Sequence, residues 1–245
     1  MATAPATASR PNEQATTGDF EFAALREARN YRHAILREFG PHLKGNVLEI
    51  GSGIGQITEL VAAKPEVKRV LALEPDTGFC TELRRRLPNQ PLVRGTAQAL
   101  QPNGRWNAIL TVNVLEHIEH DREELATYRS LLRSERGCLC LFVPARPEIY
   151  APIDGDFGHF RRYTKPELRK KLLDAGFDLL RVDYFNWVGY FAWWLNFCVL
   201  RKRHFGVGGV RMFDRVIFPV VHGMEFNFIR PPFGQSLIAV AQAKS

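Results

Sequence analysis

A short apolar strand that runs straight into a set of glycines constrains the fold of this chain more than any other segment. The sequence Val47-Leu-Glu-Ile-Gly-Ser-Gly-Ile-Gly55 carries glycines at positions 51, 53 and 55, and a helical pattern follows at once. Glycine allows a tight turn and a close approach of the backbone to a ligand, and the helix N-terminus offers free N–H groups. Such a strand–turn–helix unit is typical of a parallel α/β sheet and predicts a ligand site at the carboxyl end of the strand.

Strand and helix patterns alternate along the rest of the chain. The sequence predicts apolar strands at residues 47–50, 70–73, 92–94, 108–112, 138–143, 177–185 and 236–243. It predicts helices at residues 22–39, 54–63, 77–87 and 122–132, and one that starts at a capping box of Thr164 and Glu167 and stops at Gly176. Short apolar strands separated by helices are typical of a parallel sheet covered on both faces. We therefore expect an α/β fold with a doubly wound, Rossmann-like sheet.

The last two predicted strands are separated by a long connection, residues 186–235. A connection of that length is usually a lid, a binding surface or an interface. We expect a core domain of residues 21–185 and 236–245, with residues 186–235 inserted before the last strand as a helical lid that binds the substrate. Residues 1–20 are rich in Ala, Thr and Pro and lack the regions of a signal peptide, so we expect a disordered leader.

The composition is that of an ordinary globular protein with clustered positive charge. The 245 residues include 33 Lys and Arg against 26 Asp and Glu, a net charge of +7, which excludes an acidic disordered chain. The four cysteines form no C-x-x-C pair and have no histidine at zinc-finger spacing, so we expect no metal site and a reducing, cytoplasmic location. The cations gather at residues 161–171 and 201–204, which favours an anionic partner.

The acids near the glycines predict the kind of ligand. Glu74 ends the second strand nineteen residues after Gly55, where a carboxylate can accept two hydrogen bonds from a ribose diol. A dinucleotide site would need a glycine at position 56, but the chain has Gln56 there. Glu49, two residues before Gly51, can hold an ammonium group. This arrangement suits a ligand with an adenosine and an ammonium group but no pyrophosphate.

Four segments together resemble the class I S-adenosylmethionine-dependent methyltransferases, type 11/12 in particular. The segment 47–55 resembles their motif I, and Glu74-Pro75-Asp76 resembles their acidic second-strand loop. Thr96-Ala97 stands where the family has its adenine-binding loop, usually with Asp at the position of Thr96. Asn113-Val-Leu-Glu-His117 is similar to a segment of the small-molecule and ubiquinone-type members. The resemblance covers about residues 29–185.

This resemblance implies a seven-stranded sheet whose last strand is antiparallel, with S-adenosylmethionine as cofactor and S-adenosylhomocysteine as product. The implied cofactor-binding residues are Tyr31, Glu49, Gly51, Ser52, Gly53, Gly55, Glu74, Pro75, Thr96, Ala97 and Asn113. Among them, Glu49 and the glycines would hold the methionine part, Glu74 the ribose, and the Ala97 N–H the adenine. Asn113 would approach the sulfonium through its backbone, and Asn30 with Tyr31 would close over the cofactor carboxylate.

A narrower resemblance is to bacterial methyltransferases found beside glycan or lipid assembly enzymes. It rests on the glycine segment together with Asn30-Tyr31-Arg32, Gly158-His-Phe-Arg-Arg-Tyr163 and Gly234-Gln-Ser-Leu237.

Two histidines are placed to act on the methyl acceptor. A sulfonium methyl is already activated, so a base is needed only when the acceptor must lose a proton, as a hydroxyl must. His117 follows the fourth strand and is either a base or a helix-start histidine bonded to the backbone. His159 follows the fifth strand, in a loop where Asp154 or Asp156 can orient it and where an anionic substrate would meet Arg161, Arg162 and Tyr163. The alternative for this loop is a salt-bridged connection. We take His159 as the base, with His117 and Asp154 as the other catalytic candidates.

An aromatic segment, residues 185–200, precedes the second cluster of cations. It is too short and too interrupted by asparagine to span a membrane, which takes about 20 apolar residues. Trp and Tyr beside cations suit an interfacial helix on anionic lipid headgroups. The alternative, which we prefer, is a lid helix that lines an apolar acceptor pocket or a dimer face.

The sequence therefore predicts methyl transfer to a small or lipid-linked acceptor, most readily to an oxygen. A peripheral membrane-binding module with a vestigial cofactor site is one alternative, and an RNA methyltransferase is another. The fourth strand is not followed by an Asn-Pro-Pro-Tyr-type motif, and the aromatics do not interleave with the basic residues, so nucleic acid is disfavoured as a partner. The expected location is cytoplasmic with possible membrane contact, and the oligomeric state stays open.

Overall fold

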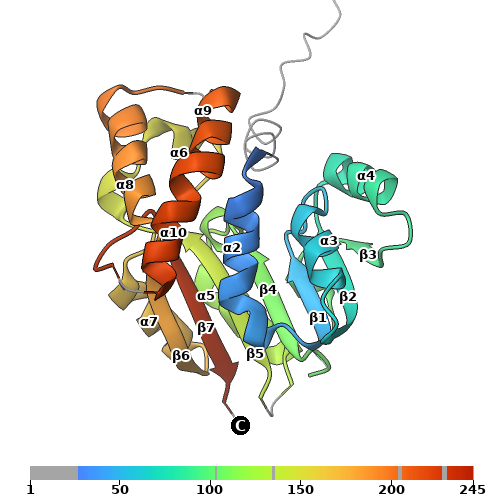
Figure 1. Cartoon of the computed structure of the whole chain (residues 1–245). Coiled ribbons are helices and arrows are strands. Elements are labelled where there is room, and N and C mark those ends of the chain that lie inside the picture. The colour runs from blue at the N-terminus through green and yellow to red at the C-terminus, as the bar shows by residue number, and fades with distance from the viewer. Residues whose placement is uncertain (1–26, 103, 134–135, 204–205, 228–230, 245) are drawn as a thin grey trace, which may run out of the picture.

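The computed structural model describes residues 27–244 except 103, 134–135, 204–205 and 228–230, and a seven-stranded sheet forms its centre (Figure 1). The strands are β1 Gly45–Ile50, β2 Val67–Glu74, β3 Leu92–Arg94, β4 Ala108–Val112, β5 Cys138–Pro144, β6 Phe177–Phe185 and β7 Ser236–Ala243. Their order is β3-β2-β1-β4-β5-β7-β6. Neighbours among β1 to β5 pair in parallel, and β7 runs antiparallel to both β5 and β6. The predicted doubly wound sheet with an antiparallel last strand is confirmed, whereas the predicted leader, 1–20, lies outside the described residues.

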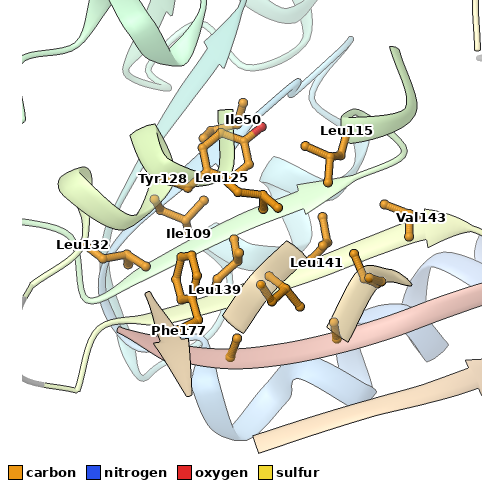
Figure 2. Close-up of a cluster of buried hydrophobic side chains, with 14 of the residues drawn as sticks. Ile50, Ile109, Leu115, Leu125, Tyr128, Leu132, Leu139, Leu141, Val143 and Phe177 are labelled. Carbon is orange, nitrogen blue, oxygen red and sulfur yellow. The ribbon is translucent and has the colours of Figure 1, made fainter. Parts of the chain in front are cut away.

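Helices cover both faces of this sheet. They are α2 Arg29–Phe39, α3 Gln56–Ala62, α4 Thr77–Arg86, α5 Asp121–Leu131, α6 Pro152–Asp156 and α7 Lys165–Asp174, followed by the helices of the insertion described below. One buried cluster packs α5 and α7 against the strands, and Figure 2 shows Leu125 and Tyr128 of α5 against Ile109 and Leu139 of the sheet. A second cluster packs α2, α3 and α10 on the other face, where Figure 1 shows α2 and α10 in front of the strands.

Local backbone chemistry explains where the helices start and stop. Residues 54 and 55 are not helical as predicted, because Gly53 and Gly55 take left-handed φ values of 52° and 80°, and α3 begins only at Gln56. The predicted cap of α7 is confirmed, since the Thr164 hydroxyl accepts a hydrogen bond from the Glu167 N–H at 3.2 Å. Gly176, with φ 85°, follows the end of this helix.

The first predicted helix, residues 22–39, is not continuous. Its first five residues lie outside the described part of the chain, and the backbone breaks at Ala28, where φ is −85° and ψ is 62°. The cause is a distant carboxylate. Asp214 accepts hydrogen bonds from the Asn30 and Tyr31 N–H groups at 3.0 and 2.9 Å and so caps the start of α2.

The connection before the last strand is a helical insertion, as the sequence predicts. It contains α8 Trp187–Trp193, a π-helical segment Trp194–Val199, α9 Val207–Met212, a second π-helical segment Phe213–Ile217, and α10 Phe218–Asn227. Figure 1 shows α8 and α9 beyond the edge at which the parallel strands end. Within the described residues, no helix has both the length and the apolar character that crossing a membrane takes. The role of the insertion as a substrate lid stays a prediction.

We expect Asp214→Ala to destabilise the chain, because it leaves two N–H groups at the start of α2 without their acceptor. Asp214 is only 2% exposed, so water replaces the carboxylate poorly, and the free energy of unfolding should fall by about 2 kcal/mol. Urea unfolding followed by circular dichroism measures it. The exposed Asp178 serves as the control, and its Ala variant should change the value by less than about 0.5 kcal/mol. Equal values for the two variants would contradict the capping role.

Candidate functional site

The predicted glycine loop lies at the carboxyl edge of the sheet, between β1 and α3. Gly51 has a left-handed φ of 71°, and a Cβ built on it would lie 2.3 Å from the Val114 side chain. Only glycine therefore lets this loop pass so close to the segment that follows β4. The N–H groups of Gly51 and Ser52 both donate to the Leu73 carbonyl, which ties the loop to the end of β2.

Glu74, at the end of β2, holds the loop from the other side. Its Oε2 accepts a hydrogen bond from the Gly53 N–H at 2.8 Å, and its Oε1 accepts one from the Asp76 N–H at 3.0 Å. Burial raises the pKa of Glu74, although both backbone hydrogen bonds oppose the shift. Each oxygen keeps a second lone pair, so the carboxylate can still accept from a ribose diol as predicted. Asp76 has a structural task, since its Oδ1 accepts from the Phe79 N–H and caps α4; the predicted Pro75 is exposed beside it.

Glu49 is buried within β1, two residues before the loop. Burial raises the pKa of Glu49 to about 8, the nearby Thr58 hydroxyl opposes this shift, and the nearby Glu74 raises the pKa further. Among the described residues, three buried polar atoms around the loop have no hydrogen-bond partner: Glu49 Oε2, Ser52 Oγ and Gln56 Nε2. Unpaired buried polar atoms are rare, so these three fit the polar methionine end of the implied cofactor.

The predicted adenine loop lies next to Glu74. The Gly95 N–H donates to the Glu74 carbonyl at 3.0 Å, and Thr96 and Ala97 then form a tight turn with Ala97 fully buried. Beyond β4, Asn113 has a left-handed φ of 53°, and its N–H donates to the Phe142 carbonyl. A backbone contact from Asn113 to the cofactor would therefore come from its carbonyl.

Tyr31 and Asn30 are placed differently from each other. The Tyr31 ring packs against the rings of Phe142, Phe185 and Phe218, and it lines a cavity rather than the glycine loop. Burial raises the pKa of Tyr31 to about 12, while hydrogen bonds with Ser236 and Asn186 lower it. The Asn30 side chain donates to the Asp214 carbonyl and so belongs to the start of α2.

A cavity of about 560 Å³ lies between the sheet edge and the insertion. The sheet edge and the loops after its strands supply polar groups, from Asn113, Glu116, His159, Arg162 and Ser236. The insertion supplies mostly apolar walls, from Ala192, Trp193, Phe197, Val210, Phe213 and Ile217. A cavity of this size and character suits a small molecule with a polar and an apolar part.

The predicted pair of Asp154 and His159 forms in the wall of this cavity. His159 Nδ1 lies 3.0 Å from Asp154 Oδ1, and the fully buried Asp154 also binds Arg162 and the Ala151 N–H. Burial alone would raise the pKa of Asp154, but the His159 hydrogen bond and the Arg162 charge outweigh it and hold the pKa below its usual value. An ionised Asp154 fixes the imidazole through Nδ1, so proton exchange with a ligand falls to Nε2.

Three charged or polar members of this loop, Asp156, Arg161 and Tyr163, do not line the cavity. The alternative partner, Asp156, pairs with Arg203 at 2.7 Å. Arg161 pairs with Asp121, and the fully buried Tyr163 donates to the same carboxylate. The expectation that Arg161 and Tyr163 hold a substrate is therefore wrong, and the salt-bridged alternative describes that half of the loop. Arg162 does line the cavity, and its guanidinium stacks 4.3 Å from the centre of the Trp193 ring.

His117 lies against His159, with 4.6 Å between the ring centres. Burial and the neighbouring His159 lower the pKa of His117 to about 4, while hydrogen bonds to the Gly158 and Phe157 backbone oppose the shift. His117 is therefore neutral at neutral pH and bonded to the backbone, which was the alternative to a base. A base with so low a pKa takes up a proton poorly, and this favours His159.

Glu116, His117 and His159 form a cluster that the cysteine pattern did not predict. Each offers one ligand atom, and the three atoms lie within 4.8 Å of one another. Two imidazoles and a carboxylate can hold a divalent transition metal. The prediction of no metal site thus rests on sequence spacing alone, and the effect of a chelator on turnover would distinguish a metal site from a histidine base.

Sequence reasoning missed Glu116, Asn186 and Ser236 as parts of the cavity wall. Asn186 directly follows β6, and Ser236 begins β7. Because β7 is antiparallel, its first residue lies at the same edge as the last residues of the parallel strands. A search for polar residues at that edge would have found both, since ligands bind beyond it in sheets of this kind.

Comparison with known proteins agrees with this geometry. A family described as methyltransferase domain matches residues 22–182. A trans-aconitate 2-methyltransferase from Methylobacterium nodulans is 29% identical over 98 residues, which are 40% of this chain and 38% of that protein. The chain thus matches well under half the length of this curated relative.

Solved structures show the same fold at low sequence identity. A putative methyltransferase from Bacillus halodurans has a TM-score of 0.60 at 18% identity and covers 87% of this chain and 99% of its own. A possible histamine N-methyltransferase from Thermotoga maritima has a TM-score of 0.63 at 16% identity, over 93% and 95% of the two chains. Phosphoethanolamine N-methyltransferase 2 of Haemonchus contortus, in complex with S-adenosyl-L-methionine, has a TM-score of 0.65 at 14% identity, over 95% and 58%.

Glu49 should make stability depend on pH. Its pKa is about 8 in the folded chain and about 4.5 in an unfolded one, so the folded state holds the proton more tightly. The stabilisation is complete below about pH 4.5 and is lost as pH rises through about 8, by up to about 5 kcal/mol relative to Glu49→Gln. Urea unfolding of both proteins across this range measures the difference. Glu59→Gln, at an exposed position of α3, should follow the wild type, and a pH-independent difference for Glu49→Gln would contradict the shift.

Proposed function

The chain belongs to the methyltransferase domain family, as a class I S-adenosylmethionine-dependent methyltransferase, and we propose that it methylates an oxygen atom of a small or lipid-linked acceptor. The cofactor that the sequence predicted, S-adenosylmethionine, is that of the family. The cavity supports the proposed acceptor and its atom. The observation that carries the proposal is the buried Asp154–His159 pair in the wall of an otherwise largely apolar cavity.

The residues around the glycine loop would hold the cofactor. Its ammonium group would meet Glu49, the free lone pairs of Glu74 would accept from its ribose, and the turn at Thr96-Ala97 would receive its adenine. When bound, S-adenosylmethionine supplies a methyl group already activated on a sulfonium sulfur. The remaining task of the chain is to position the acceptor and to remove its proton.

His159 is suited to remove that proton. Asp154 binds Nδ1 and sets the tautomer whose Nε2 accepts, and the resulting imidazolium would lie beside a carboxylate that stabilises it. An acceptor hydroxyl needs such a base, because it becomes a good nucleophile only as it loses its proton. This is why we place the transfer on oxygen rather than on carbon or on an amine nitrogen.

The cavity walls indicate the acceptor class. Arg162 is its one cation from the loop after β5, and Asp154 already neutralises that charge at 2.8 Å. At the sheet edge, a small polyanion of the trans-aconitate kind, named for the curated relative, would therefore meet little net positive charge, and the other cation of the lining, Lys202, lies on the insertion. An acceptor with a hydroxylated head and an apolar part would place the head at the sheet edge and the apolar part against Trp193, Phe197 and Phe213.

The two alternative functions that the sequence left open predict different results from the proposed function. A membrane module with a vestigial cofactor site would bind lipid without methyl transfer, and an RNA methyltransferase would bind RNA with a steep salt dependence. The cytoplasmic location and the bacterial, small-molecule assignment stay predictions.

Binding of S-adenosylhomocysteine tests the cofactor site directly. We expect a micromolar Kd by titration calorimetry, about 8 kcal/mol of binding free energy, and no heat from NADH. Glu74→Ala should weaken binding at least about tenfold, because it removes a charged acceptor of two hydrogen bonds. Glu59→Ala, on the exposed face of α3, is the matched control and should bind as the wild type does. Equal affinity of both variants would remove Glu74 from the cofactor site.

Turnover of His159→Ala tests the base. We expect methyl transfer from S-adenosylmethionine to a panel of amphipathic alcohols and phenols to fall about 10²- to 10⁴-fold, with the affinity for S-adenosylhomocysteine unchanged. His117→Ala should lose less, because a histidine with a pKa of about 4 is a weak base. Undiminished turnover of His159→Ala would eliminate it as the base.

The same assay with a chelator separates a base from a metal ligand. EDTA should leave wild-type turnover unchanged if His159 acts as a base. A loss that added manganese or zinc restores would instead assign Glu116, His117 and His159 to a metal ion and contradict the base.

A further inference from the structure

We propose that the outer face of the insertion docks on an anionic lipid surface and opens the acceptor cavity toward it. The proposed role of this docking in delivering an acceptor rests on the proposed function. The docking itself does not depend on that function. The face is defined by exposed apolar side chains between residues 191 and 224. Ten of the fifteen large apolar side chains that are exposed within the described residues lie in this range.

The helical stretch formed by α8 and the π-helical segment Trp194–Val199, which ends at its C-cap Leu200, is apolar on two sides. Its inner side is accounted for, because Trp193 and Phe197 are 6% and 5% exposed and pack with Ile149 and Ile153. Its outer side is not, because Trp194, Leu195 and Leu200 are 46%, 48% and 55% exposed. A helix that is apolar all round is normally buried in a core or in a membrane. The outer side therefore needs an apolar environment that the described chain does not supply.

The positive charges around this face favour an anionic surface as its apolar environment. Arg201, Lys202 and Arg203 are exposed between Leu200 and Val207, which are exposed as well, and Arg211 and Arg215 follow on the second half of the insertion. Two of these five cations have acidic partners, Arg203 with Asp156 and Arg211 with Glu27.

The acids of the described insertion do not offset these cations. Asp214 is buried at the start of α2, and Glu225 accepts from the Asn186 and Trp187 N–H groups. Exposed tryptophan and aliphatic side chains among cations match the boundary of a bilayer with anionic headgroups.

Part of the cavity lining is exposed on the same segment of the insertion. Lys202, Gly206 and Gly209 line the cavity and are at the same time exposed. Val207 lies between them in sequence and is 44% exposed. In Figure 1, α8 and α9 stand at the end of the molecule opposite its C-terminus, so a flat surface can approach there. An acceptor anchored in a bilayer would thus enter past the basic loop and meet the apolar walls first.

Co-sedimentation with vesicles tests the docking without reference to catalysis. The full chain should bind vesicles rich in phosphatidylglycerol and should bind vesicles of phosphatidylcholine alone at least about tenfold more weakly, with loss of binding at high salt. The double variants Leu195→Gln/Leu200→Gln and Arg201→Gln/Arg215→Gln should each lose at least about tenfold in vesicle affinity. Leu180→Gln is the matched control, since Leu180 is 51% exposed on β6, and it should bind as the wild type does.

Two further measurements make each outcome decisive. Affinity for S-adenosylhomocysteine reports whether a variant is folded, and brominated lipid in the anionic vesicles should quench the wild type more than Trp194→Phe, whatever the double variants do. No vesicle binding, or equal quenching of the two proteins, overturns the docking. A dimer in solution that Leu195→Gln/Leu200→Gln abolishes also overturns it, because a second copy would then cover the face. Vesicle binding without any methyl transfer upholds the docking and fails the proposed function, whereas transfer to soluble acceptors without vesicle binding does the reverse.

Discussion

The carboxylate of Glu74 is the interaction on which the cofactor end of this molecule depends. The Glu74 side chain accepts hydrogen bonds from the Gly53 and Asp76 N–H groups. The backbone carbonyl of the same residue accepts one from the Gly95 N–H. The loops after β1, β2 and β3 are thereby held to one residue at the carboxyl edge of the sheet. Burying this acid raises its pKa, and the two N–H donors offset part of that cost. A parallel sheet makes this possible, because its strands all end at the same edge.

Local patterns predicted the sheet well, because most of its strands contain a short apolar run bounded by turn residues. The predicted β3, β4, β6 and β7 match the observed bounds, as does the antiparallel direction that the resemblance implied. The break at Ala28 could not be predicted, because the carboxylate that causes it, Asp214, lies 184 residues after Asn30 in the chain. The same limit explains why the expectation that Arg161 and Tyr163 hold a substrate was wrong. A sequence shows that a loop is charged, but it does not show that Asp121 on α5 forms an ion pair with Arg161 and accepts a hydrogen bond from Tyr163.

The acceptor end depends on a different buried carboxylate. Asp154 binds His159, Arg162 and the Ala151 N–H at once, so a single group orients the candidate base and neutralises the nearest cation. Arg162 in turn stacks on Trp193, which joins the loop after β5 to the insertion. The polar floor and the apolar wall of the cavity are therefore joined through this ion pair and the stacking on Trp193, and the proposed acceptor would have to match both.

Helix α2 connects these two ends. Asp214 of the insertion caps its first turn, Tyr31 on that turn lines the acceptor cavity, and Arg32 donates to Gln56 at the start of the helix after the glycine loop. Methyl transfer tolerates little error in the distance between donor and acceptor, since the reacting atoms must approach to about 3–3.5 Å in line. A helix that contacts both the insertion and the start of the helix after the glycine loop would supply that alignment in the proposed reaction. This is a physical reason for the chain to join residues 30 and 214 with a buried carboxylate rather than with a local cap.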